Sequence, residues 1–177
     1  MSELRTGINL FGMMNCGKTT VGGILAVRYG LSFVDTDVLI AELYGQKPGD
    51  IIGEEGPEIF MAVQREILMD QPRTGAEIWA TGGAVAKDEE LVRHLGLSGV
   101  GVFLFVAPGI LEDRTKPEDI AKLANPKRLS YRDLYLVERM PFYEAAADLT
   151  IEVSDPSELE DITAERVAVA VETFVAA

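Results

Sequence analysis

Short apolar runs alternate with helix-like patterns along the 177 residues of the chain. The run at residues 99–107 (GVGVFLFVA) is typical of a strand buried on both faces of a parallel sheet. Strands are expected at residues 8–11, 31–35, 77–80, 99–107 and 149–153. Helices are expected at residues 18–29, 37–43, 57–69, 88–95, 109–114, 129–147 and 157–175. Strands interleaved with helices in this way predict an α/β fold with a mainly parallel sheet, in a single domain over residues 1–177.

Turn and capping residues refine these boundaries. Gly30 is expected to end the first helix, and Asp37 to cap the next one. Pro141 is expected to interrupt the helix at residues 129–147. Residues 115–127 are polar and show little periodicity, so they predict a mobile surface loop.

Composition excludes several classes of protein. Hydrophobic residues make up 47% of the chain and charged residues 25%, which excludes a disordered chain and a coiled-coil rod. The formal net charge of −13 argues against binding to nucleic acid or to an anionic membrane surface. The single cysteine, Cys16, excludes an internal disulfide. No apolar run approaches the ~20 residues of a membrane span, and the N-terminus lacks a signal-peptide pattern, so we expect a soluble cytoplasmic protein.

The clearest motif follows the first predicted strand. Residues 12–20 (GMMNCGKTT) match G-x-x-x-x-G-K-[ST], the phosphate-binding loop known as the P-loop or Walker A motif. Its glycines let backbone N–H groups point at one anion, and the following helix adds its positive N-terminal end. Lys18 is expected to reach the β- and γ-phosphates of a nucleotide, and the Thr19 hydroxyl to bind Mg²⁺.

Two residues inside this loop are unusual for the motif. Asn15 stands where many P-loops have glycine, and asparagine tolerates a left-handed backbone better than most residues. Cys16 is either a small residue that fills space behind the loop, which we favour, or a reactive thiol that makes nucleotide binding sensitive to oxidation.

Four segments, in this order, resemble the shikimate kinase family: FGMMNCGKTTVGGILA, LSFVDTDVLIAELYGQ, IWATGGAV and VERMPFYEAAADLTIEV. The resemblance covers nearly the whole chain. It implies a three-layer P-loop fold of the nucleoside-monophosphate-kinase type, with a five-stranded parallel sheet and a lid at about residues 115–127. It also implies transfer of the γ-phosphoryl group of ATP to a ring hydroxyl of shikimate, with Mg²⁺ as cofactor, in aromatic amino acid biosynthesis.

The resemblance divides the expected site into a nucleotide side and an acceptor side. The residues on the nucleotide side are Gly12, Asn15, Cys16, Gly17, Lys18, Thr19, Thr20, Arg114 and Asp155. Within this group Lys18 is expected to be catalytic, Arg114 to pack on adenine and Asp155 to lie in the adenine-contacting loop. Thr19 and Asp35 are the expected Mg²⁺ residues.

The residues expected on the acceptor side are Asp37, Gly82, Gly83, Ala84 and Arg139. By resemblance, Asp37 is the catalytic residue that contacts substrate hydroxyls and serves as the base. Its role as a helix N-cap is compatible with this one. Ala84 replaces the last of three family glycines, so its methyl group is expected to narrow the pocket. Arg139 is expected to bind the substrate carboxylate, with a surface ion pair to a nearby glutamate as the alternative.

The chain departs from the family pattern at the remaining acid-binding positions. The family has phenylalanine, arginine, two residues and glutamate after the second helix, whereas this chain has Phe60, Met61 and then Gln64. A family arginine of the lid falls near residues 120–121, which are Ile and Ala here. A charge-assisted hydrogen bond contributes roughly 1.5–3 kcal/mol, so these losses should weaken a carboxylate substrate at least tenfold.

The main hypothesis is therefore an ATP- and Mg²⁺-dependent kinase of shikimate or of a related cyclic polyol. The alternative is a catalytically silent nucleotide-binding protein with a regulatory or partner-binding role. A nucleoside monophosphate kinase ranks last, because the acceptor side is poor in arginine. The expected partners are ATP or ADP and a small hydroxylated substrate, and we expect a monomer.

Overall fold

The computed structural model describes residues 6–71, 76–96, 99–121, 123, 125, 127–155, 158 and 160–177. Within these residues the strands β1 (Gly7–Phe11), β2 (Ser32–Asp35), β3 (Glu77–Ala80), β4 (Gly99–Val106) and β5 (Leu149–Val153) form one sheet. The strand order is β2-β3-β1-β4-β5, and all neighbouring pairs are parallel. The five-stranded parallel sheet expected from the sequence is confirmed.

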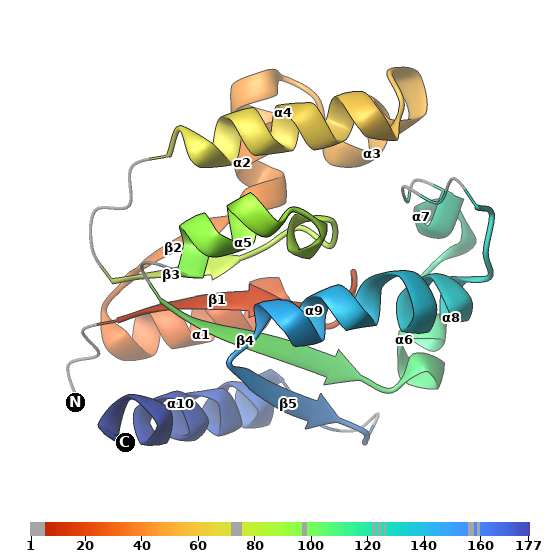
Figure 1. The fold of residues 1–177 in the computed structure, drawn as a ribbon. Coiled ribbons are helices and arrows are strands. Elements are labelled where there is room, and N and C mark those ends of the chain that lie inside the picture. Colours follow the sequence, from red (N-terminus) through yellow and green to blue (C-terminus); the bar gives the residue numbers. More distant parts are fainter. Residues whose placement is uncertain are drawn as a thin grey trace.

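Helices cover both faces of this sheet (Figure 1). The α-helices are α1 (Lys18–Tyr29), α2 (Thr36–Tyr44), α3 (Pro48–Glu54), α4 (Pro57–Met69), α5 (Glu89–Gly96), α6 (Pro108–Arg114), α7 (Pro117–Ala121), α8 (Tyr131–Asp133), α9 (Met140–Ala146) and α10 (Glu160–Ala176). A 3-10 helix, η1 (Val85–Lys87), and a π-helix, η2 (Leu134–Arg139), complete the described elements. Helices α1 and α10 pack together on one face, and α5 and α9 lie on the other.

Three local expectations are corrected by the structure. Asp35, not Asp37, caps α2: its side chain accepts hydrogen bonds from the backbone N–H groups of Asp37 and Val38. The expected loop at residues 115–127 contains the helix α7, while Lys122 within it lies outside the described residues. The interruption in the helix at residues 129–147 is a π-turn that ends at Arg139, and Pro141 sits in the first turn of α9. Proline is well suited to that position because its missing N–H would have no helical partner there.

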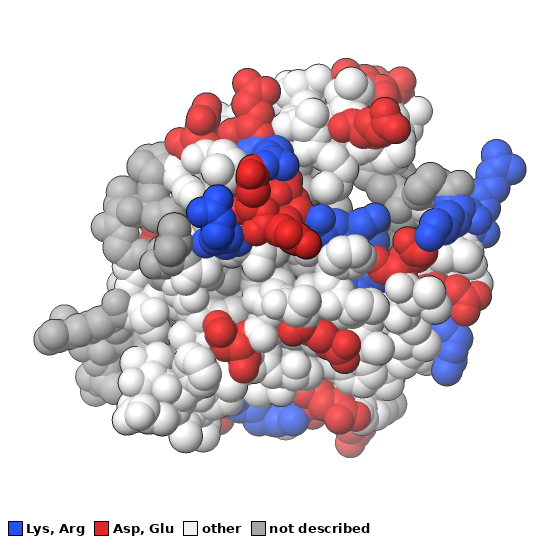
Figure 2. All heavy atoms as spheres, viewed as in Figure 1, with Lys and Arg blue, Asp and Glu red and all other residues white. Residues whose placement is uncertain are grey.

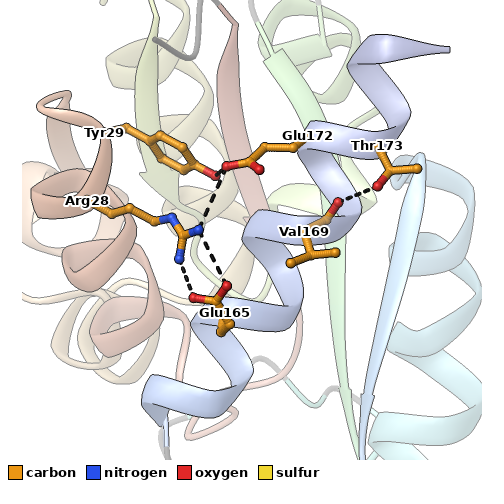
Figure 3. A network of polar contacts seen from close by, with 6 residues as sticks. All are labelled: Arg28, Tyr29, Glu165, Val169, Glu172 and Thr173. Atoms are coloured by element: carbon orange, nitrogen blue, oxygen red, sulfur yellow. Dashed lines mark hydrogen bonds and ion pairs between the residues drawn. The ribbon is translucent and has the colours of Figure 1, made fainter. Parts of the chain in front are cut away.

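The packing of α1 and α10 combines a buried apolar seam with polar contacts at its edge. Leu25 of α1 and Val167 of α10 have no exposed surface and belong to the main core. At the edge, Arg28 forms an ion pair with Glu165, and the Tyr29 hydroxyl donates to Glu172 across 2.8 Å (Figure 3). Exposed ion pairs contribute little, so most of the stability of this layer comes from apolar burial.

No helix among the described residues combines the length and apolar character that a membrane crossing needs.

Gly101 allows β4 to pass close to the end of α9. A Cβ atom added at Gly101 would lie 2.7 Å from the carbonyl oxygen of Ala146, which is backbone and cannot swing away. Gly101→Ala should therefore lower the free energy of unfolding by about 2 kcal/mol, as other overpacked sites do. Gly23→Ala is the matched control, because a Cβ at Gly23 on α1 meets nothing within 4 Å. It should raise stability by about 0.5–1 kcal/mol through helix propensity. Urea denaturation measures both; equal effects of the two variants would contradict the packing argument.

Candidate active site

The loop between β1 and α1 curls around the side chain of Lys18. Gly12 and Gly17 have φ angles of 147° and 96°, and Asn15 has a φ of 61°, so the left-handed backbone expected at Asn15 is confirmed. The Lys18 ammonium donates to the carbonyl oxygens of Gly12 and Met13 across 2.9 and 2.7 Å. The loop therefore holds a largely buried positive charge at the N-terminus of α1.

Cys16 lies behind this loop. Its side chain is 3% exposed, and its Sγ atom is 3.5 Å from Lys18 Nζ. A Cβ atom on Gly12 would come within 2.8 Å of that sulfur and 2.9 Å of the carbonyl oxygen of Leu104. This packing fits the interpretation of Cys16 as a space-filling residue, while its sensitivity to oxidation stays a prediction.

The ends of β1 and β2 meet through Asp35. The Thr19 hydroxyl donates to Asp35 Oδ2 across 2.6 Å, and the other carboxylate oxygen accepts from the backbone N–H of Asp37 at 3.0 Å. The two residues expected to hold Mg²⁺ therefore lie side by side. Hydroxyl and carboxylate oxygens are ligands that Mg²⁺ prefers, so this pair fits the ion. No cluster of three or more carboxylate, thiol or imidazole ligands occurs elsewhere in the described part of the chain.

Gly82 brings the end of β3 against Asp37. The Gly82 N–H donates to the buried Thr36 hydroxyl across 2.7 Å. A Cβ atom at Gly82 would lie only 2.3 Å from Asp37 Oδ1. Residue 82 must therefore be glycine for the Asp37 carboxylate to keep its position.

Arg139 reaches the same region from the π-turn. Its guanidinium is 4% exposed and donates to the carbonyl oxygen of Gly83 across 3.3 Å. The Tyr143 hydroxyl donates to that oxygen across 2.7 Å. The π-turn between α8 and α9 thus sets Arg139 and Tyr143 on one backbone group. A π-turn inside a helix is frequent at functional sites.

Two cavities open on these residues. The first, of about 330 Å³, is polar and is lined by Asn15, Gly17, Lys18, Thr19, Thr20, Arg114 and Glu160. The second, of about 240 Å³, is lined by Met13, Met14, Asp37, Pro48, Gly49, Ile52, Phe60, Gly83, Ala84, Asp119, Leu123 and Arg139. Figure 2 shows a hollow in the surface at the second cavity, between α3, α7 and the segment of η2 and α9.

The Asp37 carboxylate has an unusual environment in the second cavity. The side chain touches the solvent that fills the cavity, but protein atoms surround it on most sides and replace much of its hydration. This loss of surrounding water, together with the negative charge of Asp35, raises the pKa of Asp37 to about 6, and the Lys18 ammonium opposes the rise. A carboxyl group with such a pKa can accept a proton near neutral pH more readily than an ordinary aspartate.

Comparison with known proteins agrees with this geometry. The family model "Shikimate kinase" matches residues 14–171. A shikimate kinase of Symbiobacterium thermophilum is 34% identical over 161 residues, covering 89% of this chain and 92% of its own. One from Caldanaerobacter subterraneus is 32% identical with the same coverage. The chain belongs to the shikimate kinase family.

Solved structures support the same family. The shikimate kinase from Acinetobacter baumannii, solved in complex with shikimate, superposes with a TM-score of 0.81 and 26% identity. The match covers 97% of this chain and 95% of that one. Relatives in the shikimate kinase family are phosphotransferases that act on a hydroxyl group, and the resemblance drawn from the sequence motifs is confirmed.

The structure brings most of the expected site residues together. Asn15, Gly17, Lys18, Thr19, Thr20 and Arg114 share the polar cavity, and Asp37, Gly83, Ala84 and Arg139 share the second one. Gly12, Cys16, Asp35 and Gly82 pack directly against those residues. Asp155 is exposed and does not line either cavity. The roles of all these residues stay predictions.

The positions that depart from the shikimate kinase pattern contact each other. Gln64 is fully buried, and its amide lies 3.9 Å from the sulfur of Met61. Met61 packs against a small apolar cluster formed by Ile40, Ile51, Phe60 and Ala84. Phe60 reaches the second cavity, whereas Met61 is not part of its lining. An uncharged pair thus stands where the family pattern places an arginine and a glutamate.

Four residues that complete the two cavities or support them were missed by sequence reasoning. Glu160 and Asp119 add carboxylates to the cavity linings, and Thr36 and Tyr143 hold the backbone of Gly82 and Gly83. Thr36 and Tyr143 stand inside the segments LSFVDTDVLIAELYGQ and VERMPFYEAAADLTIEV, so their place in those segments was an available signal. Glu160 and Asp119 carry no such signal, because only the folded chain brings them to the cavities.

Asp37→Asn should stabilise the protein at pH 8 but not at pH 4. The folded-state pKa of Asp37 lies above the ordinary value of 3.8, so folding favours the protonated form. This contribution is fully present below pH 3.8 and is lost as pH rises through about 6, whereas asparagine stays neutral throughout. With allowance for solvent in the cavity, the gain at pH 8 should be about 1 kcal/mol.

Urea denaturation at both pH values measures this difference. Asp113→Asn is the control, because Asp113 is exposed and lines neither cavity. A loss of stability in Asp37→Asn at pH 8 would show that the Asp37 charge is not disfavoured by folding.

Proposed function

We propose that this protein is an ATP- and Mg²⁺-dependent kinase that transfers the γ-phosphoryl group to a hydroxyl of shikimate or a related cyclic polyol. One observation carries the proposal. Lys18 lines the polar cavity, and its ammonium donates across 2.7 Å to the carbonyl oxygen of Met13, a residue that lines the other cavity together with Asp37. The two cavities therefore adjoin at a pair of groups suited to a phosphoryl donor and a hydroxyl acceptor.

The polar cavity supplies the nucleotide side of this reaction. Backbone N–H groups of the loop and the positive end of α1 bind the phosphates, and Lys18 stabilises negative charge on the transferring group. The Lys18 ammonium exchanges its contacts with the Gly12 and Met13 carbonyl oxygens for phosphate oxygens. Arg114, at the rim of the same cavity, packs against the base.

The Thr19 hydroxyl and the Asp35 carboxylate would hold Mg²⁺. When bound, the ion would offset the negative charge of the nucleotide phosphates. Asp35 also caps α2, so one side chain serves the fold and the metal side of the site.

Asp37 interacts with the acceptor hydroxyl. Its carboxylate projects into the second cavity, where it orients the hydroxyl and accepts its proton as the bond to phosphorus forms. Arg139 and the backbone at Gly83 and Ala84 hold the ring of the acceptor. A protein that only binds nucleotide would have no need for this carboxylate beside Lys18, so the non-catalytic alternative is the weaker one.

The identity of the acceptor rests on relatives and on the cavity. The relatives are named shikimate kinases, and the Acinetobacter baumannii enzyme was solved with shikimate bound. In this chain Met61 and Gln64 occupy the positions of the ion pair in the family pattern. Arg139 is the one cation among the described residues that line the second cavity, called the acceptor cavity from here on. A related polyol therefore stands beside shikimate as a candidate.

Lys18→Met tests the proposal directly. It should reduce ADP release with shikimate or a cyclic polyol as acceptor by at least about 10²-fold, because it removes charge stabilisation of the transferring phosphoryl group. Lys47→Met is the control: Lys47 is exposed, lines neither cavity and should leave the rate within twofold. Equal rates for Lys18→Met and Lys47→Met would overturn the proposed function, as would ATP binding without transfer to any of the acceptors.

A further inference from the structure

The charges that line the acceptor cavity have an unexpected balance. Asp37 and Asp119 are negative, and Arg139 is the one positive side chain among the described lining residues. Partial burial and the nearby charge of Arg139 lower the pKa of Lys87, but the Lys87 side chain does not line the cavity. The remaining walls are mainly apolar, with Met13, Met14, Pro48, Ile52, Phe60, Ala84 and Leu123.

Asp119 is the carboxylate that the proposed chemistry does not use. It comes from α7, is half-buried and lines the cavity. Within the part of the chain that the structure describes, its carboxylate has no ion pair and no hydrogen bond, while its backbone N–H donates to the carbonyl oxygen of Lys116. Its negative charge therefore acts on whatever enters the cavity.

The Arg139 guanidinium already makes a hydrogen bond within the protein. It donates to the Gly83 carbonyl oxygen, which also accepts from Tyr143. A carboxylate on the acceptor would meet one arginine that is shared with the backbone and two carboxylates of its own sign. An uncharged ring would meet hydrogen-bonding groups for its hydroxyls and an apolar wall for its face, which is the usual design of a small-molecule site.

We propose that Asp119 determines specificity: it makes the acceptor cavity select an uncharged hydroxylated ring over the same ring carrying a carboxylate. This inference rests on the proposed function, because it concerns the acceptor of that reaction. Specificity is achieved here by a repulsive element as well as by the attractive ones. The selection acts at binding, so it is measurable without phosphoryl transfer.

Shikimate and its methyl ester form the matched test pair, because they share ring and hydroxyls and differ in charge. Binding of each to the full-length protein with ADP and Mg²⁺ is measured by calorimetry, and transfer by coupled ADP release. The wild type should bind the ester more tightly than the acid, with a dissociation constant lower by about fivefold or more. Asp119→Asn should tighten binding of the acid about fivefold and change binding of the ester less than twofold, since it removes one like charge from the cavity.

Glu118→Gln is the matched control. Glu118 is the neighbouring residue on α7, is exposed and does not line the cavity, so the variant makes the same change in net charge. It should leave the ratio of the two dissociation constants unchanged. The double variant Met61→Arg with Gln64→Glu restores the family's charged pair and should favour the acid independently of Asp119.

The possible outcomes separate this inference from the proposed function. Tighter binding of the acid than of the ester by the wild type would overturn the inference, and so would equal effects of Asp119→Asn and Glu118→Gln. Failure of both compounds to bind would overturn it too. If the ester binds more tightly and Asp119→Asn reduces this preference about fivefold, but neither compound is phosphorylated, the inference stands and the proposed kinase activity fails.

Discussion

The Asp35 carboxylate is the contact on which the rest of the site depends. One oxygen caps α2 through the backbone of Asp37 and Val38, and the other accepts from the Thr19 hydroxyl at the start of α1. A single side chain thus ties the ends of β1 and β2 to two helices. It also orients Asp37 toward the acceptor cavity, because the backbone N–H of Asp37 is one of its donors.

Glycine completes this arrangement from the third strand. A Cβ atom at residue 82 would lie 2.3 Å from Asp37 Oδ1, so a side chain there would displace the Asp37 carboxylate. Parallel strands place their carboxyl ends at one edge of the sheet, where ligands bind in open α/β folds. The local contacts of Asp35 and Gly82 turn that general property into a defined pair of adjoining cavities.

Charge distinguishes the two cavities within a chain whose net charge is −13. The polar cavity concentrates Lys18 and Arg114 beside the loop N–H groups, which suits a polyphosphate. The acceptor cavity has apolar walls and a negative balance among its described residues. The acidic composition therefore bears on the site itself and not only on excluded partners: among the described lining residues, positive charge gathers in the polar cavity and is scarce in the second one.

Much of the fold could be predicted from the sequence because its signals are local. Apolar runs marked every strand, and the glycine-rich loop marked the turn from β1 into α1. The prediction that Asp37 caps α2 was wrong. Asp35 and Asp37 are both suitable capping residues, and only the path of the backbone decides between them. The short helix α7 and the π-turn at Arg139 were also missed. Both depend on tertiary packing more than on periodicity.

The site followed the same division. Lys18, Thr19 and Asp37 belong to continuous motifs, so their sequence neighbours identified them. Asp119 and Glu160 come to the cavities from distant segments, and no local sequence pattern predicts that their carboxylates line a cavity. Tyr143 is intermediate: its motif was noticed, but its hydrogen bond to Gly83 depends on the turn that precedes α9.

The proposed chemistry depends on Asp37, which would accept the proton of the acceptor hydroxyl beside Lys18. The most direct measurement is the pH dependence of kcat/KM for ADP release, in the wild type and in Asp37→Asn. Since the pKa of Asp37 is about 6, the wild-type value should rise with pH up to about 6 and then level off. Asp37→Asn should be slower by about 10²-fold or more and should lack this limb. A variant that keeps both the limb and the rate would contradict the account.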